Sequence, residues 1–171
     1  AECYKNANRA DRAEEARALS LYQKKEYGQA AALLLKHGRV REAAVCHEGT
    51  GRWVEAQELW ERLGDPSRAF DCRIRGYEQS GQFDLAAEEW VRRGEMERAA
   101  ENWKKSGNHR RLAAYHETRR EWELAAVAHE KAGDLLPAAH AYKKAGRIDP
   151  AADLFVRGGG FAAAIPLLKK L

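Results

Sequence analysis

Large apolar residues and alanines recur along the chain with a period of thirteen residues. Counted from a glycine at position 1, large apolar residues occupy positions 3 and 10, and alanine pairs such as Ala86-Ala87 and Ala138-Ala139 occupy positions 6 and 7. These positions are spaced as i, i+3, i+4 and i+7, which places them on one face of an α-helix. Each repeat is therefore predicted to be one amphipathic helix of about ten residues and a tight turn.

Glycines mark the predicted turns at Gly38, Gly51, Gly64, Gly81, Gly94, Gly107, Gly133, Gly146 and Gly159. Arg120 and Lys25 stand where a glycine is missing, and the repeats that begin at Asn8 and Gly64 are four residues longer, about one helical turn. A glycine directly after a helix favours the left-handed C-terminal cap. Asp65-Pro66 predicts a helix start, because Asp caps the first turn and Pro fits within it.

Helices this short are not stable alone and must bury their apolar faces against neighbours. Their tight turns make successive helices antiparallel, so the chain is predicted to stack as αα-hairpins. The glycine that recurs in most repeats excludes a long coiled coil, and the helices are too short and too many for a four-helix bundle. The expected fold is an all-α solenoid of about thirteen short antiparallel helices, forming a single domain over residues 1–171.

The units GEMERAAENWKKS, GDLLPAAHAYKKA and GRIDPAADLFVRG resemble the tetratricopeptide-like superhelices, in particular their short-helix "AAELYxxAG" variety. The resemblance spans essentially the whole chain and implies a right-handed superhelix that binds other proteins. Similar arrays occur in coat and intraflagellar transport subunits and in accessory regions of helicases and signalling ATPases. The thirteen-residue period differs from the ~34-residue helix pair of the standard motif. We expect the chain to be part of a longer protein.

The composition indicates the compartment of the protein, but it says little about the protein's activity. The cysteines Cys3, Cys46 and Cys72 are scattered and odd in number, which favours a reducing compartment over a disulfide framework. Apolar runs are too short for a membrane span, so a cytoplasmic protein is expected. Basic residues outnumber acidic ones by 30 to 26, which only slightly favours an acidic partner.

No residues of the sequence are arranged for catalysis, and we expect neither an enzyme nor a bound metal or cofactor. No serine or cysteine has a partnered base at a recognisable spacing, and Gly158-Gly159-Gly160 lacks the flanking residues of a phosphate loop. The histidines His47, His116 and His129 occupy position 10, where packing explains them better than metal binding. The five tryptophans are likewise expected in the core.

Three pairs of arginines between residues 92 and 120 are the candidate partner-binding residues: Arg92, Arg93, Arg110, Arg111, Arg119 and Arg120. Arg110-Arg111 lies near the start of its helix, where the helix dipole disfavours positive charge. The leading hypothesis is a scaffold that docks a partner protein or a neighbouring domain through variable positions 4, 8 and 11. One alternative is a nucleic-acid-associated accessory domain that uses these arginines. A second is an oligomerisation module that associates end to end.

Overall fold

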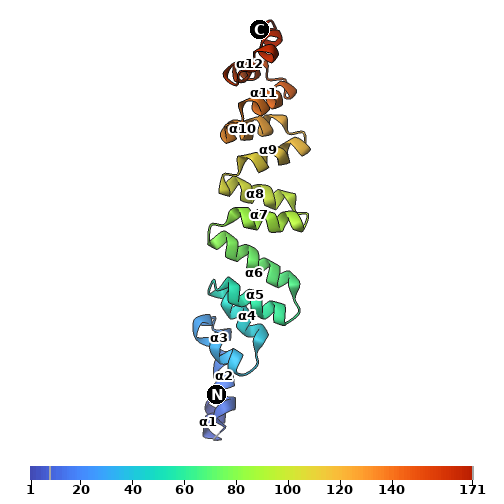
Figure 1. The fold of residues 1–171 in the computed structure, drawn as a ribbon. Coiled ribbons are helices and arrows are strands. Elements are labelled where there is room, and N and C mark those ends of the chain that lie inside the picture. The colour runs from blue at the N-terminus through green and yellow to red at the C-terminus, as the bar shows by residue number, and fades with distance from the viewer. Residues whose placement is uncertain (8, 171) are drawn as a thin grey trace. The chain divides into compact units, whose positions relative to one another are not determined.

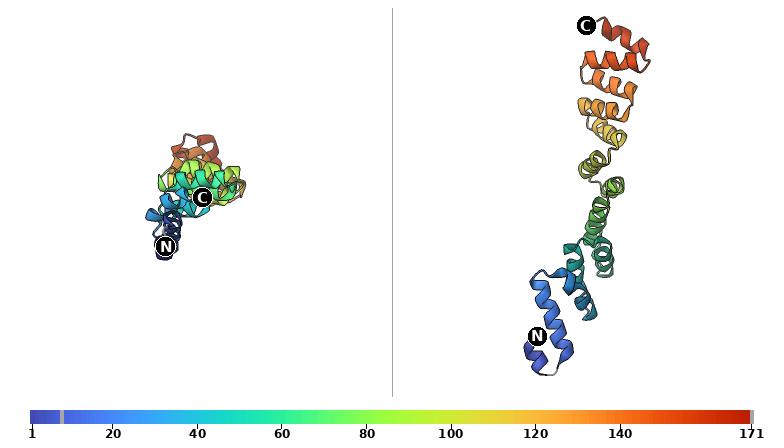
Figure 2. Two further views of the ribbon diagram at one scale, coloured as in Figure 1. Left: turned by 90° about the horizontal axis from the view of Figure 1, so that it is seen from below. Right: turned by 90° about the vertical axis from the view of Figure 1, so that its left-hand side faces the viewer.

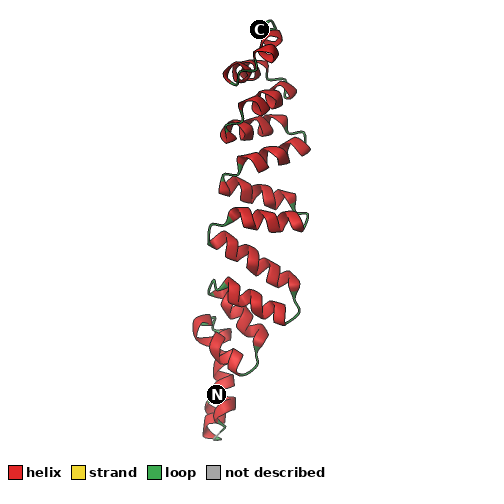
Figure 3. Ribbon diagram, in the orientation of Figure 1, coloured by secondary structure: helices red, strands yellow, loops and turns green. Residues whose placement is uncertain are grey.

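A computed structural model of the chain describes residues 1–7 and 9–170, so the turn expected at Asn8 lies outside the described residues. Within this part every element is an α-helix, and no strand occurs (Figure 3). The helices are grouped into two compact units, Ala1–Gly81 and Gln82–Leu171. The all-α class predicted from the thirteen-residue period is confirmed.

The first unit contains six helices in its described residues (Figure 1). They are α1 (Glu2–Asn6), α2 (Ala10–Gln23), α3 (Tyr27–Lys36), α4 (Val40–Gly49), α5 (Trp53–Arg62) and α6 (Pro66–Gln79). Each helix packs against its neighbours in the sequence. Helices α2 and α6 each have 14 residues, because they belong to the two lengthened repeats.

The second unit contains seven helices in its described residues, and the right-hand view of Figure 2 shows them following one another in chain order. They are α7 (Phe83–Arg92), α8 (Met96–Ser106), α9 (His109–Thr118), α10 (Trp122–Ala132), α11 (Leu135–Lys144), α12 (Ile148–Arg157) and α13 (Phe161–Leu168). Successive helices reverse direction, and each packs on the next. Helices α8 and α9 pack more loosely than the other neighbours of this unit.

The turns adopt the predicted left-handed cap. The nine repeat glycines have φ between 70° and 80°, and Lys25 (φ 61°) and Arg120 (φ 58°) adopt the same conformation where glycine is missing. At Gly64, the amide of Asp65 donates to the carbonyl of Trp60 at 2.9 Å, and the amide of Gly64 donates to that of Glu61 at 3.0 Å. This pair of bonds is the Schellman motif. The expected cap at Asp65 is confirmed, since its carboxylate accepts from the amide of Arg68.

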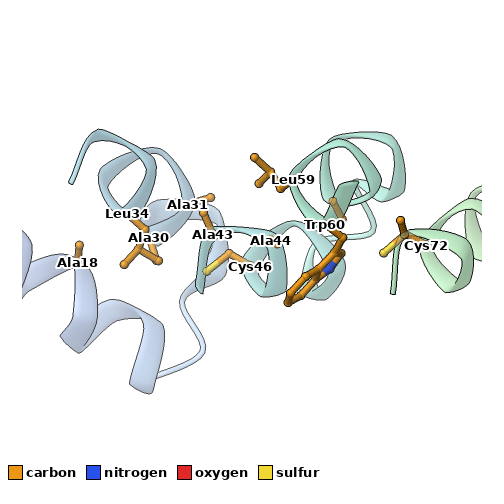
Figure 4. Packing of buried hydrophobic residues seen from close by; sticks show 12 residues of the cluster. Ala18, Ala30, Ala31, Leu34, Ala43, Ala44, Cys46, Leu59, Trp60 and Cys72 are labelled. Atoms are coloured by element: carbon orange, nitrogen blue, oxygen red, sulfur yellow. The ribbon is translucent and has the colours of Figure 1, made fainter. Parts of the chain in front are cut away.

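Alanine pairs form the centre of each unit's core, as the period predicts. Figure 4 shows Ala30, Ala31, Ala43 and Ala44 among the larger side chains of the first unit. Most large residues at position 10 are buried, whereas those at position 3 are half-buried. Two large residues of α13 depart from this pattern, because Phe161 and Leu168 are exposed.

Most side chains at positions 4, 8 and 11 are exposed, in agreement with the predicted surface. Large apolar residues exposed at these positions are Leu35, Val54, Val91, Val127, Leu136 and Val156. No helix in the described residues is long and apolar enough to cross a bilayer.

Candidate functional site

All six candidate arginines are exposed and belong to α7, α9 and the turns that follow these helices. Arg110 makes a bidentate ion pair with Asp134: its Nε and Nη2 donate to the two carboxylate oxygens, each at 2.9 Å. Asp134 is the residue before α11, so the pair joins the first turns of two helices that run in the same direction. The hydrogen bond and charge of Asp134 raise the pKa of Arg110, and Arg110 in turn lowers the pKa of Asp134.

This ion pair explains the positive charge at the start of α9. From the sequence, Arg110 is expected to contact an acidic partner, because the helix dipole disfavours positive charge at this position. In the structure the carboxylate comes from the same chain, 24 residues further on. Arg110 is thus paired within the second unit, and its contact with a partner stays a prediction.

Three more of the six arginines are also paired with carboxylates. Arg119 donates to Glu97 at 2.8 Å and to Glu121 at 3.0 Å. Arg92 contacts Glu89 at 2.6 Å, and Nε of Arg93 lies 4.0 Å from Glu95. Only Arg111 and Arg120 have no ionic partner within residues 1–7 and 9–170. The arginine-rich helices therefore carry less free positive charge than the sequence indicates.

The ion pairs of Arg110 and Arg119 belong to a pattern that recurs in both units. In the second unit, charged or polar groups 22 or 24 residues apart meet because a helix start lies beside the turn that joins the next two helices. In the first unit the carboxylates lie one turn further along, at Glu14 and Glu15 of the longer helix α2. The other pairs with these spacings are Lys36–Glu14, Arg39–Glu15, Ser106–Asp84, Asn108–Asp84 and Arg147–Glu123. Such exposed pairs contribute little stability individually, and each links two alternate helices of the stack.

Two of the position-10 histidines contact carboxylates. Nδ1 of His116 lies 2.7 Å from Glu121, and Nε2 of His129 lies 3.3 Å from Glu117. His116 and Arg119 together lower the pKa of Glu121 by hydrogen bonding to its carboxylate. Among the described residues no three His, Cys, Asp or Glu side chains are arranged to hold a metal ion. His116 and His129 are each half-buried, and each contacts one carboxylate of the same chain.

The two buried cysteines of the first unit lie in its core (Figure 4). Burial raises the pKa of Cys46 to about 11 and that of Cys72 to about 12. Both remain thiols at neutral pH, whereas a nucleophile would have to be a thiolate.

A groove of about 500 Å³ lies over α9, with α8 and α10 as its walls. Its apolar surface consists of Ala100 from α8, Leu112 and Tyr115 from α9, and Leu124, Val127 and Ala128 from α10. The side chains of Leu124 (52% exposed) and Val127 (37%) are open to solvent. The volume is within the range of small-ligand and peptide pockets.

The two ends of the groove differ in charge. Because α8 and α10 run parallel to each other and antiparallel to α9, their last turns lie at the same edge as the first turn of α9 (Figure 1). Lys104 and Lys131 line this end, and neither has an ionic partner in the described part of the chain. At the opposite end the carboxylate of Glu97 is paired with Arg119.

The sequence of α9 explains why the groove is here. At position 3 α9 has His109 where other repeats have a large apolar residue, and at position 10 it has His116. Its positions 6 and 7 are Leu112-Ala113 instead of an alanine pair, and α8 packs loosely against it. The arginines around α9 were predicted from the sequence, but the groove was not. The signal available was the loss of the repeat's packing residues in this one unit.

No protein family model matches this chain. A search of curated proteins also finds no match. The fold and the groove are therefore the basis for any functional interpretation.

Proposed function

We propose that the chain is a protein–protein interaction scaffold and that a segment of a partner protein docks in the groove over α9. The observation that carries the proposal is the apolar surface of a concave site, in which Leu124 and Val127 are exposed on one wall of the groove. Exposed apolar surface in a concave site is typical of protein docking sites.

The alternative nucleic-acid function has less support. A nucleic-acid surface needs unpaired basic residues to replace counterions. Four of the six candidate arginines, Arg92, Arg93, Arg110 and Arg119, already have carboxylate partners. Arg111 and Arg120 remain as candidates for direct contact with an acidic partner.

Self-association is favoured by a separate feature, the apolar face of α13. Phe161, Ile165 and Leu168 are spaced i, i+4 and i+7 and are 61%, 54% and 51% exposed. A second copy of the chain that covers this face would bury all three residues. Sedimentation over a range of protein concentrations measures this association directly, and an Ile165→Glu variant is expected to abolish it.

Site-specific photo-crosslinking tests docking in the groove. A benzophenone amino acid replaces Leu124 in the groove or, as a matched control, Val156, which is exposed to a similar extent on α12. Each variant is irradiated in nuclease-treated cell extract, and the adducts are identified by mass spectrometry. We expect a protein adduct at position 124 that is absent at position 156.

The other outcomes decide between the alternatives. Adducts only to nucleic acid in extract without nuclease support the accessory-domain function, and adducts only to a second copy of the chain support the oligomerisation module. Equal labelling at positions 124 and 156 rules out a specific role for the groove.

A further inference from the structure

We infer that the segment bound in the groove is an acidic amphipathic peptide, with apolar side chains along the middle and a carboxylate at the end where Lys104 and Lys131 lie. This inference rests on the proposed function and specifies the chemistry of its partner. It follows from the unequal distribution of free charge around an apolar surface.

The lysine pair provides the first step. Lys104 belongs to the last turn of α8 and Lys131 to the last turn of α10, so they lie on opposite walls at the same end of the groove. Near α9, carboxylates of the same chain pair with Arg110 and Arg119. The two lysines that line the groove have no such partner among the described residues. An apolar segment that covers this end brings the ammonium groups into partly dehydrated surroundings, where a carboxylate of the segment compensates them.

Glu101 sets the direction of the bound segment. It lines the groove one helical turn before Lys104, on the same wall and nearer the middle. A carboxylate opposite Glu101 would be repelled, whereas one opposite Lys104 would be attracted. The acidic group of the segment is therefore placed at the lysine end and excluded from the middle.

The same charges disfavour the chain's own C-terminal helix as the occupant. Helix α13 offers apolar residues with suitable spacing, but Lys169 and Lys170 follow directly after it. If α13 bound with that end at Lys104 and Lys131, four ammonium groups would be brought together. If it bound in the opposite direction, the lysines of the groove would stay uncompensated.

A selection from a phage-displayed library of random peptides tests the inference on the 171-residue chain. Peptides are selected on the wild-type chain after depletion on the Leu124→Glu/Val127→Glu variant, whose groove carries negative charge on its apolar wall. The selected peptides are then titrated against Lys104→Glu/Lys131→Glu. The matched control is Lys143→Glu/Lys169→Glu, which makes the same change of charge at exposed lysines outside the groove.

We expect the selected peptides to be enriched in Asp and Glu at one end of an apolar stretch. Their dissociation constant should rise at least about tenfold for the Lys104/Lys131 variant and change less than about twofold for the control. A Lys104→Gln/Lys131→Gln variant, which retains long side chains without charge, should give an intermediate loss. Circular dichroism melting confirms that each variant is folded.

Two results would overturn the inference in different ways. Groove-dependent peptides that lack acidic residues, or that bind the Lys104/Lys131 variant as well as wild type, refute the acidic partner and leave groove docking intact. If no peptide distinguishes wild type from the Leu124/Val127 variant, the inference fails together with the docking function on which it rests.

Discussion

Two sets of three consecutive helices, α4–α6 and α8–α10, enclose spaces of different size and chemistry. The space among α4, α5 and α6 has a volume of about 250 Å³ and is lined mainly by polar groups, including Glu48, Arg68 and Asp71. The space among α8, α9 and α10 is about 500 Å³ and has an apolar surface. Similar helical frames thus give either a small polar pocket or an open apolar groove.

The residues at positions 3 and 10 of the middle helix account for the difference. Helix α5 has Trp53 and Trp60 at these positions, and α9 has His109 and His116. Trp60 is fully buried, and its indole N–H donates to Glu48. The ring of Trp53 lies beneath the guanidinium of Arg75, 5.3 Å away. Replacing two large rings by two smaller ones opens space without changing the backbone repeat.

Trp60→Ala is expected to have the largest effect on the free energy of unfolding. Removing this fully buried ring should lower the free energy of unfolding by about 3–5 kcal/mol, because a cavity forms and Glu48 loses its donor. His116→Ala, at the same position of α9, should cost only roughly 1 kcal/mol, since that side chain is half-buried and contributes mainly one hydrogen bond. Urea denaturation of both variants measures the difference. Equal losses would mean that α9 is packed as tightly as α5.

The fold could be predicted from the sequence because the repeat is made of packing residues. Alanine pairs, large residues at position 10 and turn glycines each favour one local structure, and these local structures are all compatible with the same fold. Arg120 and Lys25 show how strong that agreement is: the period alone placed them in turns, and both adopt positive φ. The two compact units are not visible in the period, because the thirteen-residue spacing continues from Gly81 to Gly94.

The site was harder to predict because it depends on contacts between residues far apart in the sequence. Arg110 looked unpaired, since its partner Asp134 is 24 residues away in another helix. The groove requires side chains from α8, α9 and α10 together, and the only local sign of it was the unusual residues of α9. A repeat indicates where packing residues belong, but empty space appears only when the neighbouring helices are in place.

A second prediction concerns a variant in which a larger side chain fills the groove. His109→Trp places in α9 the residue that α5 has at position 3. The indole should bury part of its surface against the groove, raise the free energy of unfolding by about 1 kcal/mol and weaken binding of a groove-selected peptide about tenfold. Urea denaturation and fluorescence titration measure the two effects.

His109→Ala is the control for this prediction, because it removes the imidazole without filling the groove. Peptide binding to this variant should stay close to that of wild type. Equal weakening by His109→Trp and His109→Ala would show that the imidazole itself, and not the open volume, is required for docking.

The smallest expected effect is a pH dependence of stability. It arises because the position-10 histidines of the two regions differ in burial and hydrogen bonding. His47 of α4 is 7% exposed, and its Nδ1 has no hydrogen-bond partner in the described residues, whereas His116 of α9 contacts Glu121. Burial lowers the pKa of His47 below its usual value of 6.5; nearby Glu55 opposes this shift and Arg52 adds to it. The folded chain therefore favours the neutral imidazole.

The sign of the pH dependence follows from this lowered pKa. Above pH 6.5 His47 is neutral in both the folded and the unfolded chain, so its contribution to stability is fully present. As the pH falls through 6.5 the unfolded chain binds the proton first, and stability declines until the folded-state pKa is passed. His47→Phe should remove this decline in urea denaturation between neutral and mildly acidic pH, while His140→Asn, at an exposed histidine of α11, should leave it in place. If His47→Phe has the same pH dependence as wild type, the acid sensitivity arises from other groups, and the burial of His47 does not distinguish the two regions.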